Sequence, residues 1–553
     1  MAFAAKREKQ RFDVDANRAQ AVNDQTLLAL LRHNRDTEFG RRHGFADIHS
    51  VDAFRRTLPV SSYEAFRDDI ERIARGEQNI LTADRVTHLG ITSGTTGVGK
   101  MIPMTDVSRK TVAKAMTLLV QGFLADKVAA ARFGGRGLLL MSATLPKTSE
   151  GGLPMGPSTS VGMAGMLRMS HWIWTSPPEA YQAPTQADAM YLHLLFGLCD
   201  PSLRFLGAPF ASGILDLFHT LERHWPRLVE DIGQGSLRSD MKMAPALRAR
   251  IEKRLRPRTA HAKRLEKEFS RGMGDIARRV FPGIGWINTV CGGSFAVYAE
   301  KFAQYTGDLP VYSSVYGSTE TMLGVGIGSG KPNYVLTPRA AFFEFIDAEA
   351  MDEPNPEPRL ISELEEGKRY EIVITTRAGL YRYRMGDVVQ VVGRYRSLPI
   401  VDFLYRRGGL LNLVGEKTSE DAAYAALMGT LSRKGLELVD YTVTPDVEST
   451  PERYVFFVEL AGGAQGVDDE ALAKLLDVAL CGANPFYEMM RKPEKLGKAA
   501  FRHVEPGTFR LLKDVLVRRG ASPAQAKVPR VVRDAEMLEL LDARTRNGAA
   551  EVR

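Results

Sequence analysis

The sequence has little cysteine and no long apolar run. Only three of its 553 residues are cysteines, Cys199, Cys291 and Cys481, and they lie too far apart for a CxxC pair or for the usual ligand spacing of a zinc site. This excludes a disulfide-built domain and favours the cytoplasm as compartment. No uncharged apolar stretch approaches the roughly 20 residues that cross a bilayer, and the charged N-terminal segment lacks the apolar core of a signal peptide.

Internal repeats and low-complexity linkers are also missing, and the excess of positive charge is modest. The net charge is +8 and the isoelectric point is near 9.2, which leaves open a basic protein that binds RNA or acidic partners. Much of the basic density lies at residues 248–281, where acidic residues are interleaved and apolar residues recur at helical spacing. That pattern predicts an amphipathic helix pair with a solvated face, so we expect no nucleic-acid partner.

The hydrophobic patterning indicates a mixed α/β protein of more than one domain. Hydrophobic residues make up 44% and charged residues 25% of a chain long enough for two or more domains. Helical spacing recurs at 23–34, 50–58, 190–199 and 212–225, and β-branched or apolar runs typical of strands lie at 136–144, 369–379 and 387–395. Past residue 410 the pattern reads helix, strand, strand, helix, which predicts a smaller α+β domain.

The segment HLGITSGTTGVGKMIPMT, residues 88–105, has the composition of a phosphate-binding loop. A Walker A motif, GxxxxGK[ST], fits at Gly94, Gly99 and Lys100, but Met101 stands where the Mg²⁺-ligating hydroxyl is needed, so a P-loop NTPase is not expected. An open cradle fits better. Its hydroxyls come from Ser93, Thr95 and Thr96, its glycines let backbone N–H groups approach an anion, and Lys100 supplies the cation.

Two later motifs supply the other groups that a nucleotide needs. In YGSTE, residues 316–320, Tyr316 can stack on adenine, Thr319 can bond a phosphate oxygen, and Glu320 is a hard oxygen ligand for Mg²⁺. In GLYRYRMGDVVQV, residues 379–391, Asp387 can accept both ribose hydroxyls. The alternative for Asp387 is an ordinary β-turn after Gly386.

These motifs, in this order, resemble the three signatures of adenylate-forming enzymes. More specifically, the chain resembles the acyl acid amido synthetases, typified by plant auxin- and jasmonate-conjugating enzymes, over roughly residues 20–540. The resemblance is carried by NRDTEFGRRHGF, by the K-x-x-P-x-T that follows the phosphate loop, and by GASPAQAKVPRVV near the C-terminus. Plant members typically carry another small residue at the position of Gly317 and Ser at that of Thr319, so their acceptor preferences are not transferred.

The resemblance implies a fold and a reaction. The expected fold is a large N-terminal adenylation domain, residues 1–408, with β/α subdomains and a small β-barrel, followed by a mobile α+β domain, residues 409–553, with a hinge near 408–418. The expected reaction uses ATP and Mg²⁺ to convert a carboxylic acid into an acyl-adenylate. The amine of an amino acid, or another amine, then displaces AMP to form an amide. We expect a monomer or a weak homodimer with no membrane partner.

The resemblance also assigns roles to residues. ATP contacts are expected from Arg406, at the start of the hinge motif, and from Ser93, Gly94, Thr95, Thr96, Lys100, Tyr316, Gly317, Ser318, Thr319 and Asp387. Glu320 is the expected metal ligand and one of three catalytic residues. The others are Lys417 in the hinge and Lys527 in QAKVPR, two cations that suit a transition state gathering negative charge.

Two questions stay open at this point. The first is whether the enzyme is instead an acyl-CoA ligase or a carrier-loading adenylation enzyme, although its C-terminal motif differs from theirs. The second is the acyl pocket. Residues 138–162 are rich in Met, Leu and Gly and match a segment that borders the acyl site in relatives, but they also fit an ordinary core with a glycine-rich loop. His171, Trp172 and Trp174 are either pocket or core residues.

Overall fold

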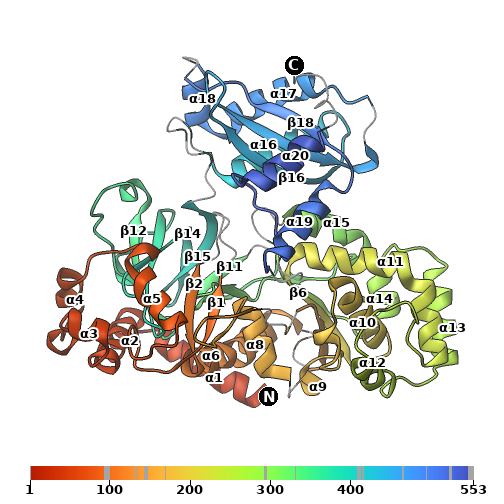
Figure 1. The fold of residues 1–553 in the computed structure, drawn as a ribbon, viewed down its shortest axis with the longest axis horizontal. Coiled ribbons are helices and arrows are strands. Elements are labelled where there is room, and N and C mark those ends of the chain that lie inside the picture. Colours follow the sequence, from red (N-terminus) through yellow and green to blue (C-terminus); the bar gives the residue numbers. More distant parts are fainter. Residues whose placement is uncertain are drawn as a thin grey trace.

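The structure is a computed structural model that describes residues 2–545 with short gaps. The residues outside the description are 1, 93–99, 130, 132–133, 142, 144–146, 168–169, 292–295, 331, 408–410, 412, 414–415, 417, 464–465, 493–494, 522–525 and 546–553. Within the described ranges the strands form four sheets, and no helix there has the length and apolarity to cross a membrane. Figure 1 shows a broad lower body with a smaller blue C-terminal domain above it.

The N-terminal helices pack against an antiparallel sheet of seven strands. Asn23, on α2, ties the helix to β12: its side chain donates to the Ala341 carbonyl at 3.0 Å and accepts from the Phe343 N–H at 3.1 Å. Ser50 caps α4 by accepting from the Ala53 N–H at 3.1 Å, as its position before an apolar run predicts. The helices are α1 (Ala2–Ala16), α2 (Ala19–Asn34), α3 (Glu38–Arg42), α4 (Val51–Thr57) and α5 (Arg67–Ala74).

The seven-stranded sheet is formed by the part of the large domain for which a small β-barrel is predicted. Its strand order is β12-β13-β14-β15-β11-β10-β9. Strand β13 is buried at every position after its first, because helices or loops cover both faces of this part of the sheet. The strands are β9 (Val315–Gly317), β10 (Met322–Gly326), β11 (Asn333–Leu336), β12 (Ala341–Asp347), β13 (Arg369–Thr376), β14 (Tyr383–Tyr395) and β15 (Leu398–Arg406).

A smaller mixed sheet, β2-β1-β5-β4, brackets the phosphate loop. Strands β1 and β2 pair antiparallel from Ile91 opposite Met101, and the Thr92 N–H donates to the Lys100 carbonyl at 3.0 Å, so the two described ends of the phosphate loop lie side by side. The strands are β1 (Val86–Ile91), β2 (Met101–Thr105), β4 (Lys147–Thr148) and β5 (Pro154–Gly156). The helices that follow in this part of the chain are α6 (Asp106–Lys114), α7 (Val120–Lys127), α8 (Ser158–Met166) and α9 (Ser170–Ile173), with a π-helical turn, Ala115–Leu119, between α6 and α7.

A parallel sheet, β3-β6-β7-β8, forms the other half of the large domain. Its helices include the 24-residue α11, whose buried stripe includes Ile214, Phe218 and Leu221. The basic segment forms three short helices, α12, α13 and α14, and not the predicted pair. Gly272, between α13 and α14, has a φ of +87°, which a continuous helix does not allow. The elements are β3 (Arg136–Leu139), β6 (Leu203–Phe210), β7 (Trp286–Val290), β8 (Val311–Tyr312), α10 (Gln186–Leu198), α11 (Ala211–Gln234), α12 (Pro245–Glu252), α13 (Thr259–Phe269), α14 (Ile276–Val280) and α15 (Ala296–Thr306).

The C-terminal domain is the predicted α+β unit, built on the sheet β16-β17-β18. Strand β17 alternates between two cores: Val455 and Phe457 pack with Phe509 of α19, while Tyr454 and Phe456 belong to the opposite core. The elements are α16 (Glu420–Ser432), β16 (Leu438–Asp446), β17 (Arg453–Leu460), α17 (Asp469–Ala483), α18 (Pro485–Arg491), β18 (Ala500–Val504), α19 (Thr508–Arg518) and α20 (Ala535–Ala543). The domain boundary at 408–409 lies beside undescribed residues and stays a prediction.

Candidate active site

A cavity of about 1280 Å³ lies where the large domain meets the C-terminal domain. Its lining comes from β1 and β2, from α6 to α8, from the parallel sheet and from the loop between β9 and β10. The C-terminal domain contributes the end of α19 with the residues just after it, and Ala526, Lys527, Pro529, Asp534 and Met537. One space therefore collects residues from both domains and from segments more than 400 positions apart in the chain.

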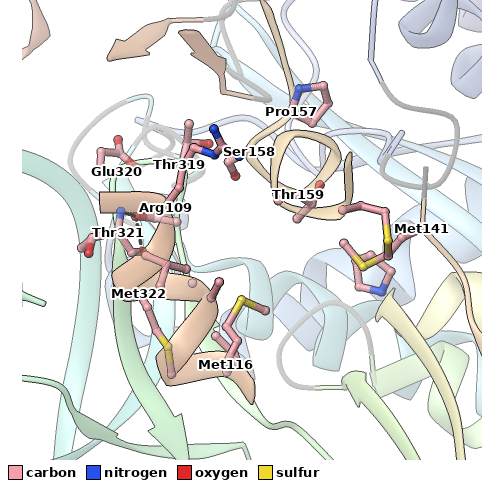
Figure 2. Close-up of a pocket in the computed structure, with 18 of the residues that line it drawn as sticks. Arg109, Met116, Met141, Pro157, Ser158, Thr159, Thr319, Glu320, Thr321 and Met322 are labelled. Carbon is pink, nitrogen blue, oxygen red and sulfur yellow. Dashed lines mark hydrogen bonds between the residues drawn. The ribbon is translucent and has the colours of Figure 1, made fainter. Parts of the chain in front are cut away.

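The polar end of the cavity is the YGSTE turn. The Ser318 N–H donates to the Thr321 carbonyl at 2.9 Å, and the Thr321 N–H donates to Ser318 Oγ at 3.2 Å. This closed turn holds Thr319 and Glu320 at the cavity (Figure 2). Gly90 of β1 makes room for it, since a Cβ there would stand 2.6 Å from Thr319 Cγ2. The glycine just before the phosphate loop thus brings the second motif against the first.

Asp387 is held by two partners that the motif does not reveal. Arg406 Nε donates to Asp387 Oδ1 at 2.6 Å, and the Tyr316 hydroxyl donates to Oδ2 at 2.9 Å. The carboxylate is only 2% exposed, so a ribose can reach it only when Arg406, which covers it, shifts. Asp387 lies within β14 after Gly386, whose φ is +81°; the β-turn alternative is therefore wrong.

The Tyr316 ring is buried and is not among the residues that line the cavity, and its predicted contact with adenine stays a prediction. Its side chain is 8% exposed and packs against Tyr334 and Phe403 at centroid distances of 5.4 and 5.8 Å. Burial, followed by the Asp387 charge, raises the pKa of Tyr316, so the phenol stays protonated and able to donate. In this structure Tyr316 orients the carboxylate that we assign to ribose.

Lys100 directly precedes β2, at the end of the phosphate loop. Its ammonium lies near two aromatic rings. Its ammonium is 5.4 Å from the ring centroid of Tyr63 and 6.0 Å from that of Tyr383, distances at which a cation and a π face attract. Burial lowers the pKa of Lys100, and the charge of Glu320 works against that shift. The predicted phosphate cation and the predicted metal ligand are thus close enough to influence each other.

Lys527, which the sequence predicts to be catalytic, reaches the cavity from the C-terminal domain. It lines the same space as Thr319 and Glu320 and is partly exposed. Burial lowers the pKa of Lys527 to about 8, although the charges of Glu420 and Asp440 partly offset the effect of burial. An ammonium with this pKa is largely charged at neutral pH and loses its charge in mildly alkaline solution.

The rest of the lining is largely apolar and rich in methionine. Among the described residues, nine of the chain's 20 methionines line the cavity. Figure 2 shows Met116 and Met322 on one side and Met141 on the other. Trp172 and Trp174 line it as well, but Trp174 is also a core residue, 4% exposed and packed with Met163 and Tyr181. The methionines are Met101, Met104, Met116, Met141, Met155, Met163, Met166, Met322 and Met537.

Most of the described residues with predicted roles come together here. Gly317, Ser318, Thr319, Glu320, Arg406 and Lys527 line the cavity, and Asp387 lies behind Arg406. The predicted contacts at Ser93, Gly94, Thr95, Thr96 and Lys417 lie outside the described residues. Within the segment 138–162, for which two alternatives were open, residues 139, 141, 147, 155–159 and 162 line the cavity.

The fit for Mg²⁺ rests on the donors that face this cavity. No group of three or more His, Cys, Asp or Glu side chains suited to a metal is found among the described residues. Magnesium usually takes one or two carboxylates and completes its shell with substrate phosphates and water. Glu320, a single carboxylate at the phosphate side of the cavity, fits that mode of binding.

Comparison with known proteins identifies the family to which this chain is similar. Residues 8–311, 334–406 and 421–536 match the GH3 family N-terminal, central and C-terminal domains. The chain is 31% identical to the indole-3-acetic acid-amido synthetase GH3.4 of Arabidopsis thaliana, over 95% of this chain and 91% of the relative. It is 30% identical to the jasmonoyl–L-amino acid synthetase JAR4 of Nicotiana attenuata, over 95% and 93%.

Solved structures agree. The GH3.15 acyl acid amido synthetase superposes with a TM-score of 0.85 and 29% identity, over 96% of this chain and 94% of that one. A 2-hydroxyisobutyryl-CoA ligase in the postadenylation state gives a TM-score of 0.57 at 14% identity, over 95% and 91%, and shows the shared fold alone. The fold is that of an adenylate-forming ligase. The chain belongs to the GH3 family, and its predicted class, a ligase joining an acid to an amino acid, is confirmed.

Proposed function

We propose that the enzyme activates an apolar carboxylic acid with ATP in the cavity and passes the acyl group to an amino acid. The observation that carries this proposal is the shared lining: Lys527 of the C-terminal domain, Thr319 and Glu320 of the YGSTE turn, and the methionine wall all face one space. The acid, the α-phosphate of ATP and the Lys527 ammonium can therefore all be bound in the same cavity.

In the first half-reaction, a carboxylate oxygen attacks the α-phosphorus and pyrophosphate leaves. Thr319 donates to a phosphate oxygen, Asp387 holds the ribose after Arg406 moves aside, and Lys100 and Lys527 offset the charge that gathers in the transition state. The phosphate-loop hydroxyls and Lys417 complete this set in our proposal. Glu320 would hold Mg²⁺, which supplies charge neutralisation of the phosphates when bound.

In the second half-reaction, the amine attacks the activated carbonyl and AMP leaves. AMP is a good leaving group, so the enzyme has only to hold a neutral amine close to the carbonyl and in line with it. One site serves both steps, and rotation of the C-terminal domain would exchange the groups that face the cavity between them.

The apolar wall defines the acid. Methionine side chains are flexible and adapt to irregular apolar shapes, and nine of them line one cavity. Burial of apolar surface contributes about 25 cal/mol per Å², so an acid with a bulky apolar body is held far better than acetate or a dicarboxylic acid. Indole-3-acetic and jasmonic acids, the acids named for the two plant relatives, belong in the first panel to be tested.

The test measures pyrophosphate release with ATP and Mg²⁺ over aromatic, aliphatic and dicarboxylic acids. Each acid is assayed with pooled amino acids, with CoA, and with neither. We expect turnover with apolar acids that rises only with amino acids, and an amide in the product mixture. Turnover that rises only with CoA would replace this proposal with a CoA ligase and leave the adenylation site standing.

A further inference from the structure

A buried polar triad joins the two domains beside Lys527. Tyr298 belongs to α15 of the large domain, Asp440 to β16 of the C-terminal domain, and Arg530 to the segment that carries Lys527. The Tyr298 hydroxyl donates to Asp440 Oδ2 at 2.7 Å, and Arg530 Nη2 donates to the same hydroxyl at 3.3 Å. Arg530 Nη1 forms an ion pair with Asp440 Oδ1. All three residues are under 9% exposed.

Asp440 and Arg530 stay ionised despite their burial, while the Tyr298 phenol stays neutral. Burial alone would raise the pKa of Asp440, but the Arg530 charge and the hydrogen bonds from Arg530 and Tyr298 hold it below its ordinary value. Arg530 also donates to the Tyr441 carbonyl at 2.6 Å and lies 4.6 Å from the ring centroid of Tyr441. Removing one partner of a buried ion pair is strongly destabilising, because it leaves the other charge buried without compensation.

The same contacts fix the segment that presents Lys527. The Val443 N–H of β16 donates to the Arg530 carbonyl at 2.8 Å, and the Val532 N–H donates to the Val443 carbonyl at 2.9 Å. Lys527 lies three residues before Arg530. Its position therefore depends on β16 through the backbone and on the large domain through the Tyr298 hydroxyl.

Other contacts between the domains are more exposed. Lys513 pairs with Asp216 at 3.7 Å, and Lys147 donates to the Arg519 carbonyl at 3.2 Å; these lysines lie at the surface, where such contacts contribute little. Lys301 of α15 bonds the Leu438 carbonyl beside the triad. The charged, desolvated link at Tyr298 is the strongest candidate among the described contacts for a latch.

We propose that Tyr298, Asp440 and Arg530 form a latch that holds the C-terminal domain in the orientation in which Lys527 faces the reacting atoms, and that the latch opens for amide formation. The proposal rests on the function proposed for Lys527. Tyr298 is a positioning residue: it acts through the Asp440–Arg530 pair and touches no substrate.

The test compares Tyr298→Phe with Tyr305→Phe. Both tyrosines lie on α15 and donate to a carboxylate, but the Tyr305 hydroxyl bonds Glu222 Oε2 at 2.8 Å within the large domain. Three quantities are measured: acid-dependent ATP–pyrophosphate exchange, aminolysis of a synthetic acyl-adenylate, and the radius of gyration in solution by X-ray scattering. The first two separate the half-reactions, and the third needs no activity.

For Tyr298→Phe we expect exchange to fall about tenfold, the factor that corresponds to one lost hydrogen bond to a charged group. Aminolysis stays unchanged or rises, and the radius of gyration increases. Tyr305→Phe should leave all three as in the parent protein. An equal fall in both half-reactions, or no change in their ratio, would overturn the latch. If the parent enzyme shows no exchange with any acid, the proposed function fails, and scattering alone decides whether the hydroxyl links the domains.

Discussion

The two ends of the cavity are built in different ways. At the adenylate end, each polar group is held by named neighbours: Asp387 by Arg406 and Tyr316, and the YGSTE turn by the Ser318–Thr321 hydrogen bonds. Over the rest of the lining, which we assign to the acyl group and call the acyl end, apolar side chains predominate, with nine methionines among them. The first end suits one invariant ligand and the second suits a ligand whose shape can vary.

Because of this difference, we expect the polar end to determine the rate of phosphoryl transfer and the apolar end to determine which acid is accepted. Preorganised hydrogen bonds and charges lower the barrier to phosphoryl transfer whatever the acid is. Flexible apolar side chains select the acid by size and shape, and selection of this kind is worth about 1–3 kcal/mol per methylene-sized change. Substitutions at the adenylate end should therefore affect all acids equally, and substitutions at the acyl end should reorder them.

The largest effect is expected from Glu320→Ala and Asp387→Ala. Each removes a carboxylate that we assign to ATP, and adenylate formation should fall by about 10³-fold or more with every acid tested. ATP–pyrophosphate exchange measures it, with circular dichroism to establish that the variants fold. Near-normal exchange in either variant would remove that residue from the adenylate end.

The next largest effect is expected in the pH dependence of adenylate formation. The pKa of Lys527 is about 8, and the protonated form is the one that stabilises phosphate charge. The value of kcat/KM for ATP in the exchange reaction should therefore hold level below pH 8 and fall about tenfold per pH unit well above it. Lys527→Arg keeps the charge throughout this range, so its residual activity should lose the alkaline fall. The same fall in Lys527→Arg would assign the titration to another group.

A smaller effect, confined to the acid, is expected from Met116→Trp. The larger ring fills part of the acyl end, where Met116 faces Met141 (Figure 2), and should lower kcat/KM for the bulkiest acids about tenfold relative to the smallest. KM for ATP should stay within about twofold. Met489→Trp is the matched control, since Met489 is 52% exposed on α18. A uniform loss over all acids would contradict the division of the site into two ends.

The smallest effect is expected from Tyr316→Phe. This change removes the hydroxyl that orients Asp387 but keeps the buried ring, so KM for ATP should rise about threefold to tenfold. A change of acid preference without a change in KM for ATP would assign Tyr316 to the acyl end.

Local sequence patterns predicted what is local. The Ser50 cap, the strands that contain residues 369–376 and 387–395, and the α+β C-terminal domain all follow from spacing within a few residues. The motif residues Thr319 and Glu320 were predicted at the nucleotide side because each signature is a continuous segment. The same signatures predicted the mixed α/β adenylate-forming fold, and the superposition on a solved acyl acid amido synthetase confirms it.

Contacts between distant segments were not predicted. The nine methionines of the cavity are spread from Met101 to Met537, and no local pattern shows that they converge. Tyr316 illustrates the same limit. The motif gives no sign that the Tyr316 hydroxyl donates to Asp387, which lies 71 positions away. The latch residues Tyr298, Asp440 and Arg530 meet only through tertiary packing.

The most direct test of the account follows the oxygen of the acid. An acid that supports turnover is labelled with ¹⁸O in both carboxylate oxygens and converted with ATP and an amino acid, and the AMP and the amide are weighed by mass spectrometry. If the carboxylate attacks the α-phosphorus and the amine then expels AMP, each AMP carries one ¹⁸O and each amide retains the other. Unlabelled AMP, or label in inorganic phosphate with ADP as product, would contradict an acyl-adenylate and with it the central claim.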